Sequence, residues 1–208
     1  MARPRSDIRA RVLRAARAEF LARGVAAASL RGIARRARTT IGMVYYYFPK
    51  KDDLFMGVIE EVYAGFLDDL AAVVRAAPDS RGRLRGLFAR VGAISDDERE
   101  VILLVVREVI SSPPRRARII DRFLHGHIPL ILSVIADGQR EGVIDPALPL
   151  PLALVVTGSV GAFPQLAARF LPPLGLAGDA TAADRLVDLL LGGIGPRAAR
   201  ERSGFAAS

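Results

Sequence analysis

Apolar residues recur at helical spacing along this 208-residue chain, and no stretch sustains the strict alternation typical of a strand. In the first such segment, Ile8, Val12, Ala16 and Phe20 share one face of a helix expected over residues 7–23. The same spacing continues to residue 194, so the chain is predicted to be all-α, with roughly nine helices.

Capping residues and helix stops give the boundaries of these helices. Ser29 and Thr40 are placed as N-caps, Gly24 is expected to end the first helix, and Pro129 is expected to kink the seventh. The predicted helices are 7–23, 30–37, 41–47, 51–77, 80–94, 96–110, 113–140, 148–163 and 186–194. The termini, 1–5 and 196–208, are expected to be disordered.

Positive charge is concentrated at the N-terminus. Residues 1–51 contain 13 Lys+Arg and 2 Asp+Glu, a net of +11, whereas the remaining residues contain 17 and 20, a net of −3, which together give the formal +8. This asymmetry is typical of a polyanion-binding segment, although a merely solvated basic face is the alternative. Cysteine is absent, which excludes disulfides, thiolate catalysis and Cys-based metal sites.

No membrane association is expected. The Arg-rich residues 1–23 lack the continuous apolar stretch of a secretory signal. Residues 148–163 carry no charge, but they are fewer than the ~20 that a membrane span needs, and Pro149 and Pro151 interrupt them. We interpret this segment as a buried helix and expect a cytoplasmic protein.

Two short helices, 30–37 and 41–47, joined by a tight turn, predict a helix-turn-helix. The helices must approach closely, which requires a small residue such as Ala34. Ile33, Ala37 and Val44 are expected to form the joint core. In this motif the second helix enters the major groove of DNA while the first crosses the backbone.

The segment SLRGIARRARTTIGMVYYYFPKKDDL, residues 29–54, resembles the DNA-binding region of the tetracycline-repressor (TetR) family. The positions that match the family pattern are Ile33, Ala34, Ala37, Thr40, Gly42, Val44, Tyr45, Tyr47, Phe48, Lys51 and Leu54. Three positions depart from it: Arg38 stands where glycine is usual, Thr39 replaces valine, and Lys50 replaces a Ser or Asn cap. A positive φ at Arg38 would be strained, so the turn either is strained or avoids that conformation.

The resemblance implies a DNA-contacting set made of Ser29, Arg31, Thr39, Thr40, Ile41, Gly42, Met43, Tyr45, Tyr46 and Lys51. Hydroxyls and helix N-termini would bind phosphates, and the second short helix would face the groove. Tyr45 has a core role as its alternative, whereas Tyr47 and Phe48 are expected in the core. Arg3 and Arg5 are a candidate minor-groove arm.

The resemblance also implies three regions: a helix-turn-helix domain over 1–51, a ligand-binding and dimerisation domain over 52–195, and the tail. Residues 148–170 and 182–194 are the candidate homodimer helices, with an internal core as the alternative. Candidate pocket residues, each with a core role as alternative, are Phe66, Phe88, Arg107, Phe123, His125 and Phe163.

We therefore predict a transcriptional regulator, a repressor released from a palindromic double-stranded DNA operator by a small apolar effector. A ligand-responsive activator and a helical small-molecule or lipid-binding protein with an incidental basic N-terminus are the alternatives. No nucleophile–base pair, phosphate loop or metal-spaced cluster is visible in the sequence, so no catalytic residue, cofactor or metal is expected. His125 and His127, two apart on a helix, point to different sides.

Overall fold

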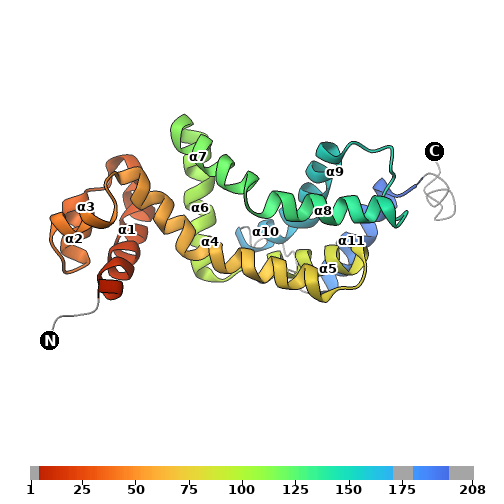
Figure 1. Cartoon of the computed structure of the whole chain (residues 1–208), viewed down its shortest axis with the longest axis horizontal. Coiled ribbons are helices and arrows are strands. Elements are labelled where there is room, and N and C mark those ends of the chain that lie inside the picture. Colours follow the sequence, from red (N-terminus) through yellow and green to blue (C-terminus); the bar gives the residue numbers. More distant parts are fainter. Residues whose placement is uncertain (1–4, 171–179, 197–208) are drawn as a thin grey trace. The chain divides into compact units, whose positions relative to one another are not determined.

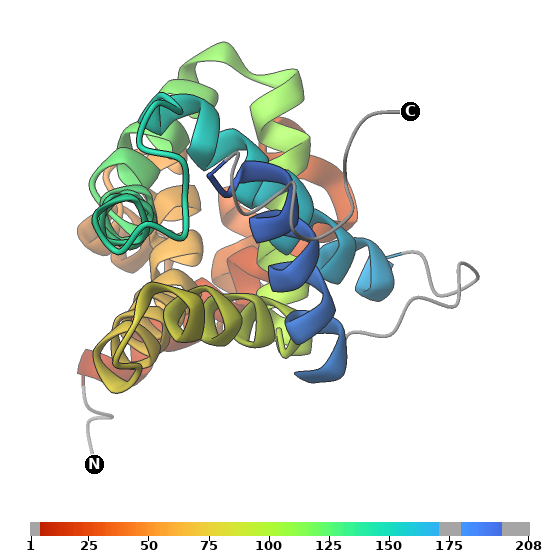
Figure 2. The ribbon, with the colours of Figure 1, turned by 90° about the vertical axis from the view of Figure 1, so that its right-hand side faces the viewer.

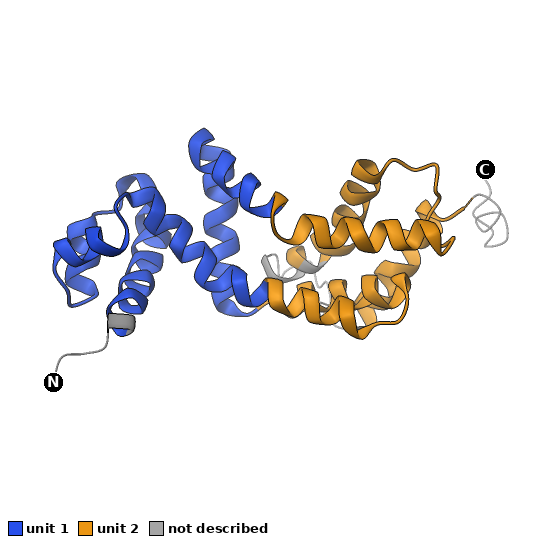
Figure 3. Ribbon diagram, in the orientation of Figure 1, with its two compact units in different colours: residues 1–66, 95–123 blue, residues 67–94, 124–208 orange. Residues whose placement is uncertain are grey.

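The computed structural model describes residues 5–170 and 180–196, and every regular element within these ranges is helical (Figure 1). The chain forms two compact units (Figure 3). Unit 1 comprises residues 1–66 and 95–123, and unit 2 comprises residues 67–94 and 124–208. Each unit is built from two separate stretches of chain. The two units therefore do not correspond to the predicted functional domains 1–51 and 52–195, and that boundary remains a prediction.

Unit 1 contains the N-terminal helices and the helices that follow residue 95. Its elements are α1 (Arg5–Ala27), α2 (Leu30–Arg36), α3 (Ile41–Tyr47), the first part of α4 (Lys51–Ala76), α6 (Asp96–Ser111) and α7 (Pro113–Leu124). The core centres on Phe20 of α1 and Phe55 of α4, whose rings meet edge to face with centroids 6.1 Å apart. Leu104 and Ile119 bring α6 and α7 into the same core.

Local signals set the helix ends in unit 1. Gly24 has φ 79° and interrupts α1, as its predicted role as a helix stop requires, although helical backbone resumes to Ala27. α6 begins with a capping box: the Ser95 hydroxyl accepts from the Glu98 amide, and the Glu98 carboxylate accepts from the Ser95 amide. Arg5, predicted as disordered, begins α1.

Unit 2 contains the second part of α4 and the elements α5 (Ser80–Gly92), α8 (His127–Arg140), α9 (Leu150–Thr157), the π-helical turn η1 (Gly158–Ala162), α10 (Phe163–Phe170) and α11 (Ala180–Ile194). α11 packs against α5 (Figure 2), and α5 also contacts α8. Gly161 lies directly on the Phe88 ring, where a Cβ would collide, so close packing within unit 2 requires glycine at this position. The buried Ser80 donates from its hydroxyl and amide to the Glu141 carboxylate, and these two hydrogen bonds lower the pKa of Glu141.

The seventh predicted helix, 113–140, is two helices, and the kink expected at Pro129 lies elsewhere. α7 ends at Leu124 and α8 begins at His127. A proline ring clashes with the carbonyl four residues earlier, which here belongs to His125. The helix therefore breaks before the proline, and Pro129 lies in the first turn of α8, where its missing N–H has no helical partner to lose.

The eighth predicted helix is also divided, and the prediction that it is buried is wrong for the single chain. The π-helical turn η1 separates α9 from α10, but the backbone stays helical from Leu150 to Phe170. Ala153 and Thr157 are buried, but Leu152, Val155 and Phe163 are exposed. Within the described residues no single helix is long and apolar enough to span a membrane; α7 and α8 meet those criteria only when taken together across their break. The predicted tail, apart from Pro196, lies outside the described residues.

Candidate nucleic-acid interface

The helix-turn-helix predicted from the sequence is confirmed in its core and its caps. Ile33, Ala37 and Val44 are buried where α2 and α3 meet. The Ser29 hydroxyl accepts a hydrogen bond from the Gly32 amide at 3.2 Å, as an N-cap does. Thr40 accepts from the Met43 amide at 3.3 Å in the same way. Both helices therefore begin at exposed hydroxyl-bearing caps.

The turn between α2 and α3 is strained. Arg38 has φ 52° and is the one non-glycine residue with positive φ among those the structure describes. This conformation costs a side-chain-bearing residue about 1–2 kcal/mol relative to glycine. The turn closes with hydrogen bonds from the Arg38 amide to Arg35 and from the Thr39 amide to Ala34. Of the two alternatives that the sequence left open, the strained turn is the observed one.

The predicted groove face is partly available to a ligand. Ser29, Arg31, Thr40 and Gly42 are exposed, and a Cβ added to Gly42 would meet only the Thr40 hydroxyl at 3.8 Å. Packing within the chain therefore does not require glycine there, and its use for close approach to DNA remains a prediction. Three other predicted contacts are half-buried: Thr39, Ile41 and Met43. Ile41 packs partly on the core, which reduces the surface it can offer to a base edge.

The aromatic residues of α3 divide between surface and core. Tyr45 and Tyr46 are 51% and 67% exposed, so the core alternative for Tyr45 is wrong. Phe48 is buried and Tyr47 packs against the same core, as predicted. The two exposed phenols are free of the core and suited to phosphate oxygens, which remains a prediction.

Lys51 has a structural role that the sequence did not reveal. Its Nζ donates to the carbonyl of Ala26 at 2.6 Å and of Ala28 at 3.2 Å, which fixes the start of α4 to the end of α1. A phosphate contact can use only the remaining donor of the ammonium group. The neighbouring Lys50 is exposed, and Asp53 replaces the missing cap because its carboxylate accepts from the Lys50 amide at 3.2 Å.

Arginines without acidic partners surround this motif. Within residues 5–170 and 180–196, no carboxylate pairs with the exposed Arg14, Arg31, Arg35, Arg36 or Arg38. Of the candidate arm, Arg3 lies outside the described residues. Unpaired guanidinium groups keep their full attraction for an external anion, because no internal carboxylate neutralises them.

Carboxylates of α4 pair instead with a row of arginines on α7. Arg115 donates to the buried Glu108 of α6 at 2.6 Å and to Asp52 at 3.2 Å. Arg118 pairs with Asp53 at 3.1 Å. Arg122 donates twice to Glu60, at 2.7 and 2.8 Å, which lowers the pKa of Glu60. This row, Arg115–Arg118–Arg122, holds the first turns of α4 directly after Lys51.

The candidate pocket residues are not gathered into one described cavity. Phe66, Arg107 and Phe123 belong to unit 1, and Phe88, His125 and Phe163 belong to unit 2. Arg107 is exposed, and its guanidinium lies beside Gly24 and donates to the Phe20 carbonyl at 3.4 Å. Phe88 is core beneath Gly161, and Phe163 is 68% exposed. The effector site remains a prediction.

Comparisons with known proteins agree with the geometry of the site. A family profile described as "Bacterial regulatory proteins, tetR family" matches residues 12–58. The HTH-type transcriptional repressor SCO4008 of Streptomyces coelicolor is 30% identical over 154 residues, covering 72% of this chain and 74% of that protein. The HTH-type transcriptional repressor KstR2 of Mycobacterium tuberculosis is 32% identical over 150 residues, covering 69% and 72%.

Solved structures share the fold. The structure of KstR2, described as a ketosteroid transcriptional regulator, has a TM-score of 0.59 and 25% identity, and the alignment covers 95% of this chain and 98% of that one. FadR of Bacillus subtilis, solved in complex with stearoyl-CoA, has a TM-score of 0.74 and 18% identity, with 89% and 98% covered.

Proposed function

The chain belongs to the tetR family of bacterial regulatory proteins, and from this premise we propose a repressor that leaves its operator when an apolar effector binds. One observation supports the DNA-binding half most strongly. The exposed surface around α2 and α3 combines hydroxyl caps, two exposed tyrosines and unpaired arginines. Because the chain belongs to this family, we infer that its basic N-terminus serves DNA binding and is not incidental. Such a regulator acts in the cytoplasm, where the operator DNA lies, and needs no catalytic activity.

Dimerisation is assigned to the apolar faces of α9–α10 and α11, the segments 148–170 and 182–194. Leu152, Val155 and Phe163 are exposed along the first segment and Leu189 on the second. A Cβ at Gly158 would meet nothing within 4 Å, so a second copy can approach the backbone closely there. Exposed apolar residues grouped in this way are typical of an interface rather than of a monomer surface.

Release by an effector requires that a change in the body reach the recognition helices. The row Arg115–Arg118–Arg122 ties α7 to the start of α4, so a displacement of α7 would move α4 and, through the Lys51 hydrogen bonds, the end of α1. A small shift is sufficient, because two recognition helices must match half-sites about one DNA turn, ~34–36 Å, apart. The ketosteroid in the description of KstR2 and the stearoyl chain in the FadR complex support an effector with a large apolar part.

Selection from a random double-stranded DNA pool tests the proposal. We expect an enriched inverted repeat whose half-sites are about one helical turn, or a multiple of it, apart. Stearoyl-CoA and a ketosteroid are then titrated against the selected duplex, and at least one should lower its affinity about tenfold or more. No enrichment would contradict DNA recognition, whereas tighter binding with a probe would contradict release and favour the activator alternative.

A further inference from the structure

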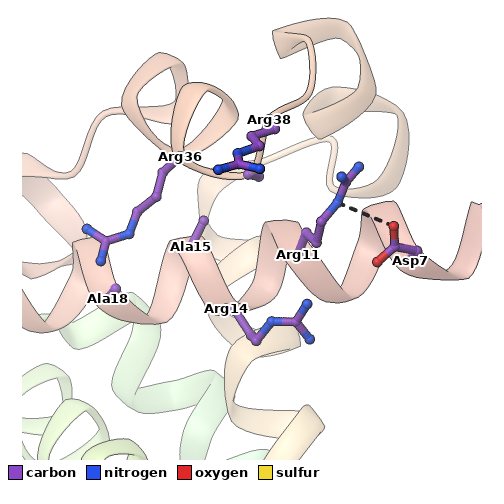
Figure 4. Close-up of a pocket in the computed structure, with 8 residues that line it drawn as sticks. Asp7, Arg11, Arg14, Ala15, Ala18, Arg36 and Arg38 are labelled. Carbon is purple, nitrogen blue, oxygen red and sulfur yellow. Dashed lines mark ion pairs between the residues drawn. The ribbon is translucent and has the colours of Figure 1, made fainter. Parts of the chain in front are cut away.

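A basic hollow lies between α1 and the end of α2 (Figure 4). Its volume is about 550 Å³, and it is open to solvent on one side. Arg36 and Arg38 reach it from the end of α2 and the following turn, and Arg11 and Arg14 come from α1. Asp7, whose carboxylate lies 3.7 Å from the Nε of Arg11, is the one acidic residue among those lining it. The lining therefore carries three positive charges in excess.

Three of the four arginines of the hollow have no ion-pair partner among the described residues. Arg14, Arg36 and Arg38 have no carboxylate partner in the part of the chain that the structure describes. The Nε of Arg11 is buried there without a hydrogen-bond partner, so this side chain is held in place yet retains an unused donor. Like charges that line one hollow repel one another, and an external anion would offset that repulsion.

The strained turn is the second observation that points to this hollow. Arg38 adopts a positive φ, a conformation in which the glycine usual at this position in the family would be unstrained. Strain of this kind persists where the surrounding structure enforces it and is concentrated at functional sites. Here the strain places a guanidinium group over the hollow, where glycine would place none.

The position of the hollow beside α3 indicates which kind of anion would bind there. Arg38 precedes Thr40, the N-cap of α3, by two residues, so their Cα atoms are at most about 7 Å apart. A duplex contacted by the N-terminus of α3 therefore passes within reach of the Arg38 side chain. Resting on the proposed function, we propose that this arginine hollow binds a backbone phosphate of the operator beside each recognition helix, with Arg38 as its principal contact.

The test measures operator affinity of the full-length chain as a function of salt concentration. Arg38→Gly and Arg36→Gln are compared with Arg116→Gln, a matched loss of one exposed charge on α7. We expect each hollow variant to lower the affinity for all DNA sequences alike, about five- to tenfold. The slope of log K against log salt should flatten by about 0.9 per protomer. Arg38→Gly should melt no lower than the parent, because glycine tolerates the turn, so its loss of affinity cannot result from misfolding.

Ethylation interference locates the contact. Ethylating one phosphate in each half-site should lower the operator affinity of the parent chain and leave the affinity of Arg38→Gly unchanged. If the parent binds its operator but both hollow variants keep the parent's salt slope, the hollow proposal is wrong and the proposed function stands. An equal effect in Arg116→Gln would also contradict it, because a general charge effect would then be sufficient. A parent chain that binds no duplex overturns both proposals.

Discussion

The arginines of the helix-turn-helix and those of α5 in unit 2 differ in what they pair with. On α5, Arg81, Arg83, Arg85 and Arg90 each pair with an aspartate of unit 2. On α2 and the turn after it, Arg31, Arg35, Arg36 and Arg38 have no acidic partner among the described residues. The same residue type thus stabilises the fold in one region and remains available to an external anion in the other, and composition alone does not separate these two roles.

The largest effect on DNA affinity is expected when several of the unpaired arginines are replaced together. Replacing Arg31, Arg36 and Arg38 together with glutamine should lower operator affinity at least a hundredfold at about 0.1 M salt. The slope of log K against log salt should flatten by about three per protomer, as fluorescence anisotropy can measure. The matched control replaces Arg81, Arg85 and Arg116 with glutamine. An equal loss of affinity in the control would remove the distinction between the regions.

Breaking a buried pair should affect stability rather than DNA affinity. Arg115→Ala leaves the buried Glu108 with only the Nε of Arg107, 3.9 Å away. An uncompensated buried carboxylate destabilises the fold, here by about 2–3 kcal/mol in urea unfolding. The exposed neighbour Arg116→Ala should change the free energy of unfolding by less than about 0.5 kcal/mol. Equal values for the two variants would show that the pair contributes nothing.

Lys50 and Lys51 are adjacent, but only Lys51 is expected to contribute to both stability and DNA affinity. Lys51→Ala removes two hydrogen bonds to carbonyls and should lower the free energy of unfolding by about 1–2 kcal/mol. It should also weaken every DNA sequence alike and flatten the salt slope by about one. Lys50→Ala should flatten the slope with almost no effect on unfolding. A changed site preference in Lys51→Ala would show that Lys51 reads bases.

The smallest effect is expected at Glu60. Its pKa lies below the ordinary 4.5 because Arg122 donates hydrogen bonds to its carboxylate. The pair therefore stabilises the fold above pH 4.5, and this contribution is lost as the pH falls through the lowered pKa. This half-buried pair is worth about 1 kcal/mol or less. In the Glu60→Gln variant, the free energy of unfolding should fall less between neutral and acid pH than in the parent. An equal fall in both chains would show that the pair contributes nothing.

The fold could largely be predicted from the sequence because its signals are local. Ser29, Thr40 and Ser95 cap helices through hydrogen bonds within three residues, and helical periodicity identifies the buried face. The break before Pro129 was misplaced by a few residues because a proline acts on the carbonyl four residues earlier. The exposure of Phe163 could not be predicted, because apolar periodicity does not distinguish a core from an interface.

The site was less predictable because its decisive features depend on distant residues. Nothing near Lys51 in the sequence indicates that its ammonium group would reach Ala26 and Ala28. The hollow depends on α1 packing against the end of α2, which brings together Arg11 and Arg38 from positions 27 residues apart. Arg38 itself carried a signal, as a departure from the family pattern, but its use becomes visible only with the observed φ.

We expect the unpaired arginines of the N-terminal helices to neutralise DNA phosphates. Titration of the full-length chain with its selected operator between about 50 and 200 mM salt tests it directly. If the chain makes six to ten phosphate contacts, affinity should fall about 10³- to 10⁵-fold over this range. Affinity that stays constant across it, or the absence of binding to any duplex at about 50 mM salt, would contradict the claim.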